Sequence, residues 1–233
     1  AAVTRSRRCH EERPPSTRGL AKATFGWLSI KTNCDPLRGG RLHLDSVKKT
    51  SSTTASKIMP AYHSKIDGAG ADEACGCALL PLKTKLRGPA PAAPPEGDDI
   101  IDETIKYFRP NCLFRNFDVS KSSDRTLVYL TLSMQQFLKE CERHSTRQAG
   151  EKAVKSLILK QFPIPGSPGW PLGGLFPPPK DIQEGEAWRL YMKQARDELA
   201  SRTLDVLYKD TGEKDKWWGS FARRKFMQKE LRA

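Results

Sequence analysis

The spacing of apolar residues predicts five helices in the C-terminal part of the chain. The first helix follows the capping residues Asp98 and Asp99, keeps its apolar residues on one side and stops at Pro110. Its apolar positions are Ile100, Ile101, Ile105 and Phe108. A stripe of this kind indicates a helix that buries one face against a core.

The second predicted helix, opened by Ser123 and Asp124, is apolar around most of its circumference. One face carries Leu127, Leu130, Met134, Phe137 and Cys141, and another carries Val128, Leu132 and Leu138. Such a helix is usually enclosed by protein. Alternation within residues 127–132 would also suit a strand, and continuation of the pattern to Cys141 favours a helix.

Three further helices complete the pattern. The third spans 146–161, with Ala153, Leu157 and Leu159 as core positions. The fourth spans 183–208, with Trp188, Tyr191, Ala195, Leu199 and Val206 on one face. The fifth is capped by Asp215 and carries Trp217, Trp218, Phe221, Phe226 and Met227. With no convincing hairpin, the fold class is all-α, a compact bundle of about five helices with one largely enclosed helix.

Two proline-rich segments interrupt the helices. Residues 59–97 read as an extended N-terminal arm that wraps the core, and residues 88–95 read as polyproline II. Residues 162–172, here called the proline loop, separate the third and fourth helices. Seven of the 17 prolines lie between 163 and 179, which predicts a rigid connection.

Residues 1–58 differ from the rest in charge. They contain twelve basic and four acidic residues, a net charge of +8, whereas residues 59–233 have 28 basic and 23 acidic residues, a net charge of +5. The segment is predicted to be a disordered basic extension. It resembles an organelle transit peptide, a nucleic-acid-binding arm, or an over-extended gene model that precedes an initiator at Met59. We favour the last interpretation.

The catalytic and metal-binding patterns of common enzymes are missing. There is no Walker A loop, dinucleotide-binding glycine motif, nucleophile elbow or zinc template, and no apolar run reaches the 18 or so residues of a membrane span. Cys75 and Cys77 form the one close cysteine pair, and reduced thiols are expected. Cys141 and His144, at i and i+3, would suit a thiol enzyme, but a core cysteine beside a surface histidine is the commoner meaning. We expect no catalysis, cofactor or metal.

Two surfaces are candidates for binding a partner. The C-terminal surface combines aromatic and basic side chains, as protein–protein hot spots and nucleic-acid sites do: Trp217, Trp218, Arg223, Arg224 and Lys225. The proline loop supplies Pro163, Pro165 and Trp170. Whether the tryptophans belong to the core or to an interface stays open at this stage, as does whether the loop binds or merely connects.

Four collinear segments together resemble subunit 3 of the actin-related protein 2/3 complex. They are residues 59–64 (Met-Pro-Ala-Tyr-His-Ser); residues 78–82 leading to 88–91; the proline loop; and Lys216-Trp-Trp218 with Phe221, Arg224, Phe226 and Met227. The resemblance covers essentially all of 59–233, and residues 1–58 have no counterpart. It implies a compact helical subunit with one enclosed helix and no enzymatic activity.

The resemblance also implies partners. They are the other subunits of a seven-chain assembly, chiefly actin-related protein 3, together with actin filaments at a branch junction in the cytoplasm. The hypothesis from the sequence is therefore a non-catalytic structural subunit for actin nucleation and branching. The alternative is a basic helical module that binds nucleic acid, motivated by the total net charge of +13.

Overall fold

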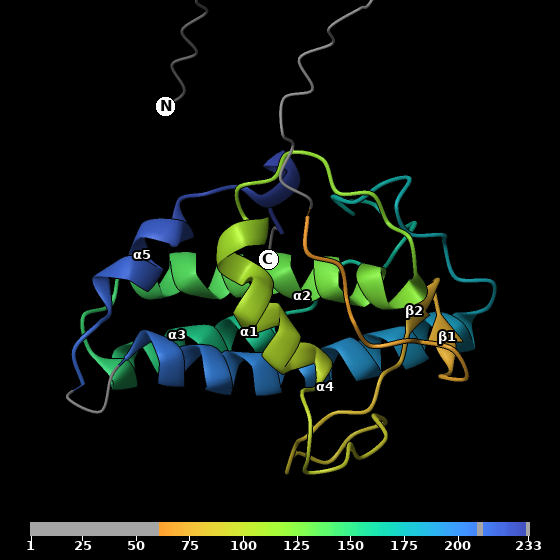
Figure 1. The fold of residues 1–233 in the computed structure, drawn as a ribbon, viewed down its shortest axis with the longest axis horizontal. Helices are drawn as coiled ribbons and strands as arrows, with labels where there is room; N and C mark the ends of the chain where they lie inside the picture. The colour runs from red at the N-terminus through yellow and green to blue at the C-terminus, as the bar shows by residue number, and fades with distance from the viewer. Residues whose placement is uncertain (1–60, 209–211, 232–233) are drawn as a thin grey trace, which may run out of the picture. The chain divides into compact units, whose positions relative to one another are not determined.

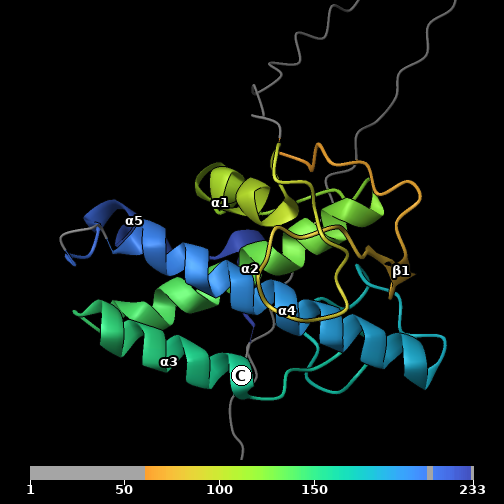
Figure 2. The ribbon, with the colours of Figure 1, turned by 90° about the horizontal axis from the view of Figure 1, so that it is seen from below.

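Helix α2 is the central element of the computed structural model, which describes residues 61–208 and 212–231. Figures 1 and 2 show it crossed or flanked by the other helices. The elements in chain order are β1 (Glu73–Ala74), β2 (Cys77–Ala78), α1 (Ile100–Asn111), α2 (Ser122–Glu142), α3 (Arg147–Leu159), α4 (Ile182–Leu207), α5 (Lys216–Ala222) and the short 3₁₀ helix η1 (Phe226–Gln228). The all-α prediction is confirmed. The predictions for residues 1–58 lie outside the described residues.

Burial of α2 on nearly all sides confirms the prediction of an enclosed helix. Fifteen of its 21 residues are buried, and it contacts α1, α3, α4, α5 and β2. Two of its buried hydroxyl groups donate hydrogen bonds back to the helix itself. Thr131 Oγ1 donates to the Leu127 carbonyl at 2.7 Å, and Ser133 Oγ donates to the Tyr129 carbonyl at 3.0 Å. This back-bonding lets these two hydroxyl groups lie in an apolar interior without an unpaired donor.

Helix α1 begins as expected and ends slightly later than expected. Asp99 accepts from the backbone of Asp102, whose side chain accepts from Asp99 in turn, which forms a capping box. Pro110 does not stop the helix, which runs on to Asn111. A proline removes one backbone donor, and in the last turn this loss affects a single bond at a frayed end.

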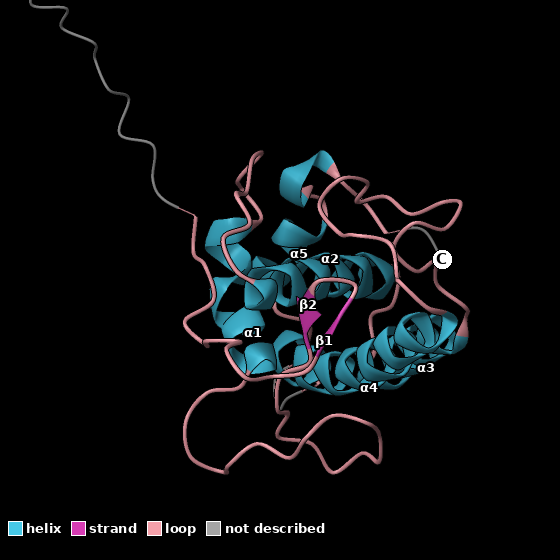
Figure 3. Ribbon diagram, turned by 90° about the vertical axis from the view of Figure 1, so that its right-hand side faces the viewer, coloured by secondary structure: helices cyan, strands magenta, loops and turns pink. Residues whose placement is uncertain are grey.

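A short hairpin is present although the sequence offered no convincing one. Strands β1 and β2 pair antiparallel across a turn at Cys75 and Gly76, whose φ angles are 50° and 69°. Two successive positive φ angles define the tight turn that matches strand twist, and Cys75 stands where Asn or Asp is usual. Strand β1 contacts α4 and β2 contacts α2 (Figure 3). The Cys75 N–H donates to Glu184 Oε1 at 2.8 Å, which ties the turn to the start of α4.

Buried carboxylates hold the irregular segment that precedes α1. Ser64 donates through its backbone N to Asp124 at 2.9 Å and through its hydroxyl to Glu103 at 2.7 Å. Lys65 N donates to the other Glu103 oxygen at 3.0 Å. Acceptors on α1 and α2 therefore satisfy backbone donors that would otherwise be buried without partners.

An ion-pair cluster on α4 holds the residues around the start of α1. Arg202 contacts Asp99 at 2.8 and 3.0 Å, Asp102 at 2.8 Å and Glu198 at 2.9 Å, and donates to the Lys83 carbonyl. Burial alone would lower the pKa of Arg202, but the surrounding carboxylates raise it above its usual value. The guanidinium thus joins α4, the α1 cap and the loop before it.

Two details of the predicted helix faces are wrong. Leu159 is 76% exposed, so it does not belong to the core stripe of α3. The buried apolar residues of this helix are Val154, Leu157 and Ile158. The last helix does not reach Phe226, because α5 ends at Ala222 and Phe226 begins η1.

Candidate partner-binding surface

Helix α5 is fixed to the end of α2 by two residues that precede Trp217 in the sequence. Lys214 Nζ donates to the carbonyls of Cys141 and Glu142 at 2.9 and 3.0 Å, which satisfies acceptors in the last turn of α2. The Asp215 side chain then caps α5 by accepting from the backbone N of Trp217 at 2.7 Å. The orientation of α5 is therefore set by polar contacts at its start.

The two adjacent tryptophans take opposite roles, because neighbours on a helix point about 100° apart. Trp218 is 8% exposed, stacks on Phe108 with ring centroids 6.1 Å apart, and lies 4.2 Å from the Arg109 guanidinium carbon. Trp217 is 72% exposed. Trp218 is therefore a core residue, and Trp217 presents a large aromatic surface to solvent.

The three basic residues after α5 also differ from one another. Arg223 is exposed and pairs with Glu142, its Nε and Nη2 lying 2.7 and 2.6 Å from the same oxygen. Lys225 lies 3.7 Å from Glu230. Arg224 is exposed and makes no ion pair within the described part of the chain. Arg224 is thus the cation of this group that is free to meet an external carboxylate.

The turn that follows holds the C-terminal segment against α2. Phe226 is fully buried against Phe117, and its backbone N donates to Gln135 Oε1 at 3.0 Å. Met227 N donates to the Phe114 carbonyl at 3.0 Å. The basic residues therefore lie on a short bridge between two anchored points.

The proline loop is built from two consecutive turns of one type. Ser167 N donates to the Ile164 carbonyl at 3.0 Å, and Trp170 N donates to the Ser167 carbonyl at 3.2 Å. Each turn has proline at its second position and glycine at its third, with φ of 80° at Gly166 and 85° at Gly169. Pro-Gly is the sequence preferred by type II turns, because the third residue requires a positive φ.

Aromatic packing fixes this loop to the core. Trp170 is half-buried, stacks on Tyr129 with centroids 6.0 Å apart, and meets Trp188 edge-on at 5.5 Å. Pro165 is buried and Pro163 is half-buried. The loop is therefore rigid, and most of its apolar surface already serves to cover α2 and α4.

The structure does not bring the two candidate regions into one patch. Helix α5 and the proline loop lie toward opposite ends of α2 in Figures 1 and 2. The C-terminal segment runs between them, since the Leu231 carbonyl accepts from Gln136 Nε2 on α2 at 3.3 Å. Any partner that contacts both regions must extend along α2.

One exposed apolar residue at the start of α4 was not among the candidates predicted from the sequence. Ile182, the first residue of α4, is 87% exposed. The signal was present, because Ile182 lies off the stripe formed by Trp188, Tyr191 and Ala195. An apolar residue outside the core stripe of a helix is a candidate contact.

The thiols are poorly suited to nucleophilic chemistry. Burial raises the pKa of Cys141 to about 11 and that of Cys77 to about 12, so both thiols are protonated near neutral pH. His144 contributes its backbone carbonyl to the Tyr208 hydroxyl at 3.0 Å. No group of three or more metal-ligating side chains occurs among residues 61–208 and 212–231.

A family model and several known proteins identify the same family for this chain. The family described as P21-Arc, the ARP2/3 complex ARPC3 (21 kDa) subunit, matches residues 59–231. A protein named actin-related protein 2/3 complex subunit 3 from Schizosaccharomyces pombe is 46% identical over 177 residues, which cover 74% of this chain and 100% of the relative.

Relatives of the same name from two other organisms agree. The Arabidopsis thaliana protein is 45% identical over 167 residues, 71% of this chain and 96% of its own length. The Saccharomyces cerevisiae protein is 39% identical over 184 residues, 74% of this chain and 100% of its own length. The family match over residues 59–231 includes the enclosed helix, the proline loop and the C-terminal surface, and the chain therefore belongs to the family of the ARP2/3 complex ARPC3 (21 kDa) subunit.

Proposed function

We propose that this chain is a non-catalytic structural subunit of the actin-related protein 2/3 complex that supports nucleation and branching of actin filaments. The family match over residues 59–231 carries the proposal. The chain would act in the cytoplasm at the actin cytoskeleton, with actin-related protein 3 as its chief neighbour and actin filaments as a further contact. Among the described residues, no helix has the length and apolar character needed to cross a membrane.

The C-terminal surface is the part of the molecule that best suits such a contact. Trp217 is exposed although it is a large aromatic residue, and Arg224 is exposed without an ion pair in the described part of the chain. Tryptophan and arginine dominate protein–protein hot spots, because they bury a large area and retain directed polar contacts. We expect Trp217 and Arg224 to contact actin-related protein 3, with Arg223 and Lys225 at the rim.

A rigid surface lowers the free-energy cost of binding, because few side chains and loops must be ordered. Lys214 and Phe226 fix the backbone on either side of the proposed contacts. The high pKa values of the buried thiols support a role without covalent catalysis.

The test removes charge from the C-terminal surface without touching the core. The double variant Arg224→Ala with Lys225→Ala should reduce recovery of the other subunits in affinity purification and lower branch density in an actin polymerisation assay. Arg223 is left in place, since it also pairs with Glu142.

The matched control removes the same charge from exposed positions of α3 and α4, with Lys152→Ala and Lys193→Ala. The control should assemble normally. Equal recovery and equal branch density for both double variants, with unchanged thermal stability, would remove the proposed contact.

A further inference from the structure

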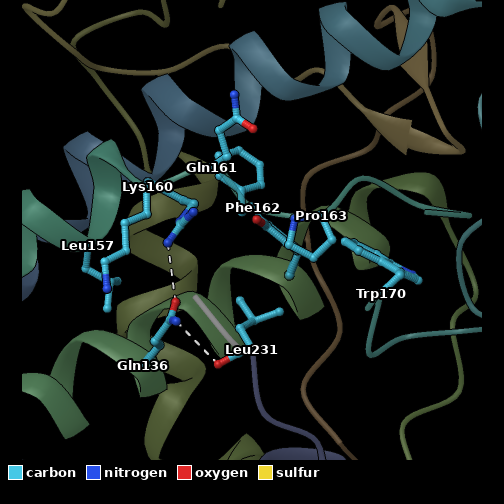
Figure 4. A pocket seen from close by; sticks show the side chains of 10 residues that line it. Gln136, Leu157, Lys160, Gln161, Phe162, Pro163, Trp170 and Leu231 are labelled. Atoms are coloured by element: carbon cyan, nitrogen blue, oxygen red, sulfur yellow. Dashed lines mark hydrogen bonds between the residues drawn. The ribbon is translucent and has the colours of Figure 1, made fainter. Parts of the chain in front are cut away.

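A small cavity lies where the proline loop leaves α3 and faces the C-terminal segment. Figure 4 shows Gln136, Lys160, Phe162 and Leu231 around it, with Pro163 and Trp170 on the side of the proline loop. Its volume is about 10 Å³. This is the room that one water-sized group occupies, such as a single carboxylate oxygen.

Arg196 of α4 lines this cavity and is buried without a counter-charge from residues 61–208 or 212–231. Its exposed fraction is 2%, and a guanidinium carries five N–H donors. Its Nη2 donates to Gln136 Oε1 at 3.3 Å, whereas its Nε has no hydrogen-bond partner in the described part of the chain. Within the described residues Arg196 forms no ion pair, in contrast to Arg202, which contacts three carboxylates.

Neighbouring aromatic rings compensate the charge only in part. The guanidinium carbon lies 4.7 Å from the ring centroid of Phe162 and 5.7 Å from that of Phe137. Burial raises the pKa of Tyr129 to about 12, and the positive charge of Arg196 opposes this shift. Cation–π contacts contribute about 0.5–2 kcal/mol. Removing a charged group from water costs several kcal/mol, so a strong demand for an anion remains.

The cavity wall presents donors and a second positive charge. Lys160 is exposed and lines the cavity, and none of the ten lining residues is Asp or Glu. The Gln136 amide is oriented by its donation to the Leu231 carbonyl, so its oxygen faces the guanidinium. A ligand at this point must accept hydrogen bonds, and negative charge is favoured.

We propose that Arg196 forms the floor of a binding site for one carboxylate group, supplied by an acidic side chain of a neighbouring chain. One carboxylate oxygen occupies the cavity and accepts from the guanidinium, while Lys160 lies beside it. The site itself rests on the cavity and on Arg196 alone. Its assignment to a neighbouring chain rests on the proposed function as a complex subunit.

The first experiment tests the site on the full-length chain by itself. Sodium formate, the smallest carboxylate, should raise the melting temperature of the wild type progressively and leave that of Arg196→Met less affected. This variant should fold, because replacing a buried charge by an apolar side chain of similar length is often neutral or stabilising for the protein. The control is Arg189→Met on the same helix, because Arg189 is paired with Glu186 at 2.9 Å. This control should respond to formate as the wild type does.

A second measurement needs no variant of the buried residue. The Nε–H group of Arg196 is shielded and unpaired, so its nitrogen-15 NMR signal should shift on formate addition. Lys160→Met should weaken formate binding severalfold. Absence of both the NMR shift and the formate-specific stabilisation would overturn the site and leave a cavity for water.

The second experiment identifies the source of the carboxylate. In the assembled complex, Arg196→Met should weaken retention of the subunit by roughly 30-fold or more, because truncating one partner of a buried charge pair is expensive. Arg189→Met should not. Unchanged retention together with a clear formate response would uphold the site and assign it to a small carboxylate from solution. Normal assembly of the Arg224→Ala, Lys225→Ala double variant would count against the proposed contact alone, and the formate result would still stand.

Discussion

Replacement of each adjacent tryptophan by alanine separates stability from binding. Trp218→Ala removes a side chain that is 8% exposed, stacked on Phe108 and covered by Arg109. Truncation of a buried aromatic residue to alanine costs about 3–5 kcal/mol. For a domain of this size, about 2–4 °C of melting temperature is lost per kcal/mol, so the expected decrease is about 6–20 °C.

Trp217→Ala removes a side chain of the same size that is 72% exposed. Its effect on the free energy of unfolding should stay within about 0.5 kcal/mol. If Trp217 is a hot spot, its loss weakens assembly by about 2 kcal/mol, roughly 30-fold in affinity.

Thermal unfolding of both variants and competitive incorporation into the complex measure the two effects. If Trp217→Ala lowers the melting temperature as much as Trp218→Ala does, the assignment of Trp218 to the core and Trp217 to the surface is refuted. A stable Trp217→Ala protein that assembles with wild-type affinity would refute the binding role.

Three further experiments test the packing. Arg202→Met should lower the free energy of unfolding by about 3 kcal/mol, because it leaves the buried Asp99 carboxylate without its counter-charge. Urea denaturation measures the change, and a loss below about 1 kcal/mol would contradict this expectation. Gly150→Ala should lower the free energy of unfolding by about 1–3 kcal/mol, because the new Cβ would lie 2.6 Å from the Tyr208 hydroxyl oxygen. The control Gly219→Ala places its Cβ in open space and should be neutral or stabilising. Equal effects of the two variants would count against the close packing of Gly150 on Tyr208. Iodoacetamide at pH 7.5 should leave the buried thiols of Cys75, Cys77, Cys112 and Cys141 unlabelled until the protein is unfolded, because burial raises their pKa values. Peptide mass mapping checks this result. Rapid labelling of these four thiols in the folded protein would contradict it.

Sequence reasoning succeeded where the signal was local or strongly periodic. The apolar residues of α2 surround the helix, and no arrangement other than enclosure can remove them all from water. Pro-Gly pairs at 165–166 and 168–169 specify a positive φ at each glycine, so the rigidity of the proline loop follows from two dipeptides. The family resemblance rested on the same unusual segments.

Sequence reasoning failed where the outcome depended on a partner distant in the chain. The start of α1 was predictable, but its passage through Pro110 depended on the low cost of a missing bond in the last turn. The hairpin at Cys75 depends on a cysteine accepting a positive φ beside Glu184 of α4, a contact across 109 positions. Periodicity contains no information about such contacts.

The sequence by itself determined that five helices form, that one of them is buried on nearly all sides, and that the loop between two of them is stiff. These properties follow from apolar spacing and turn chemistry. Only the tertiary structure decided which tryptophan of an adjacent pair faces the core, which arginine has a counter-charge, and which is buried without one among the described residues. Those outcomes depend on which side chains from remote segments reach the same place, and electrostatic and packing energies act through space rather than along the chain.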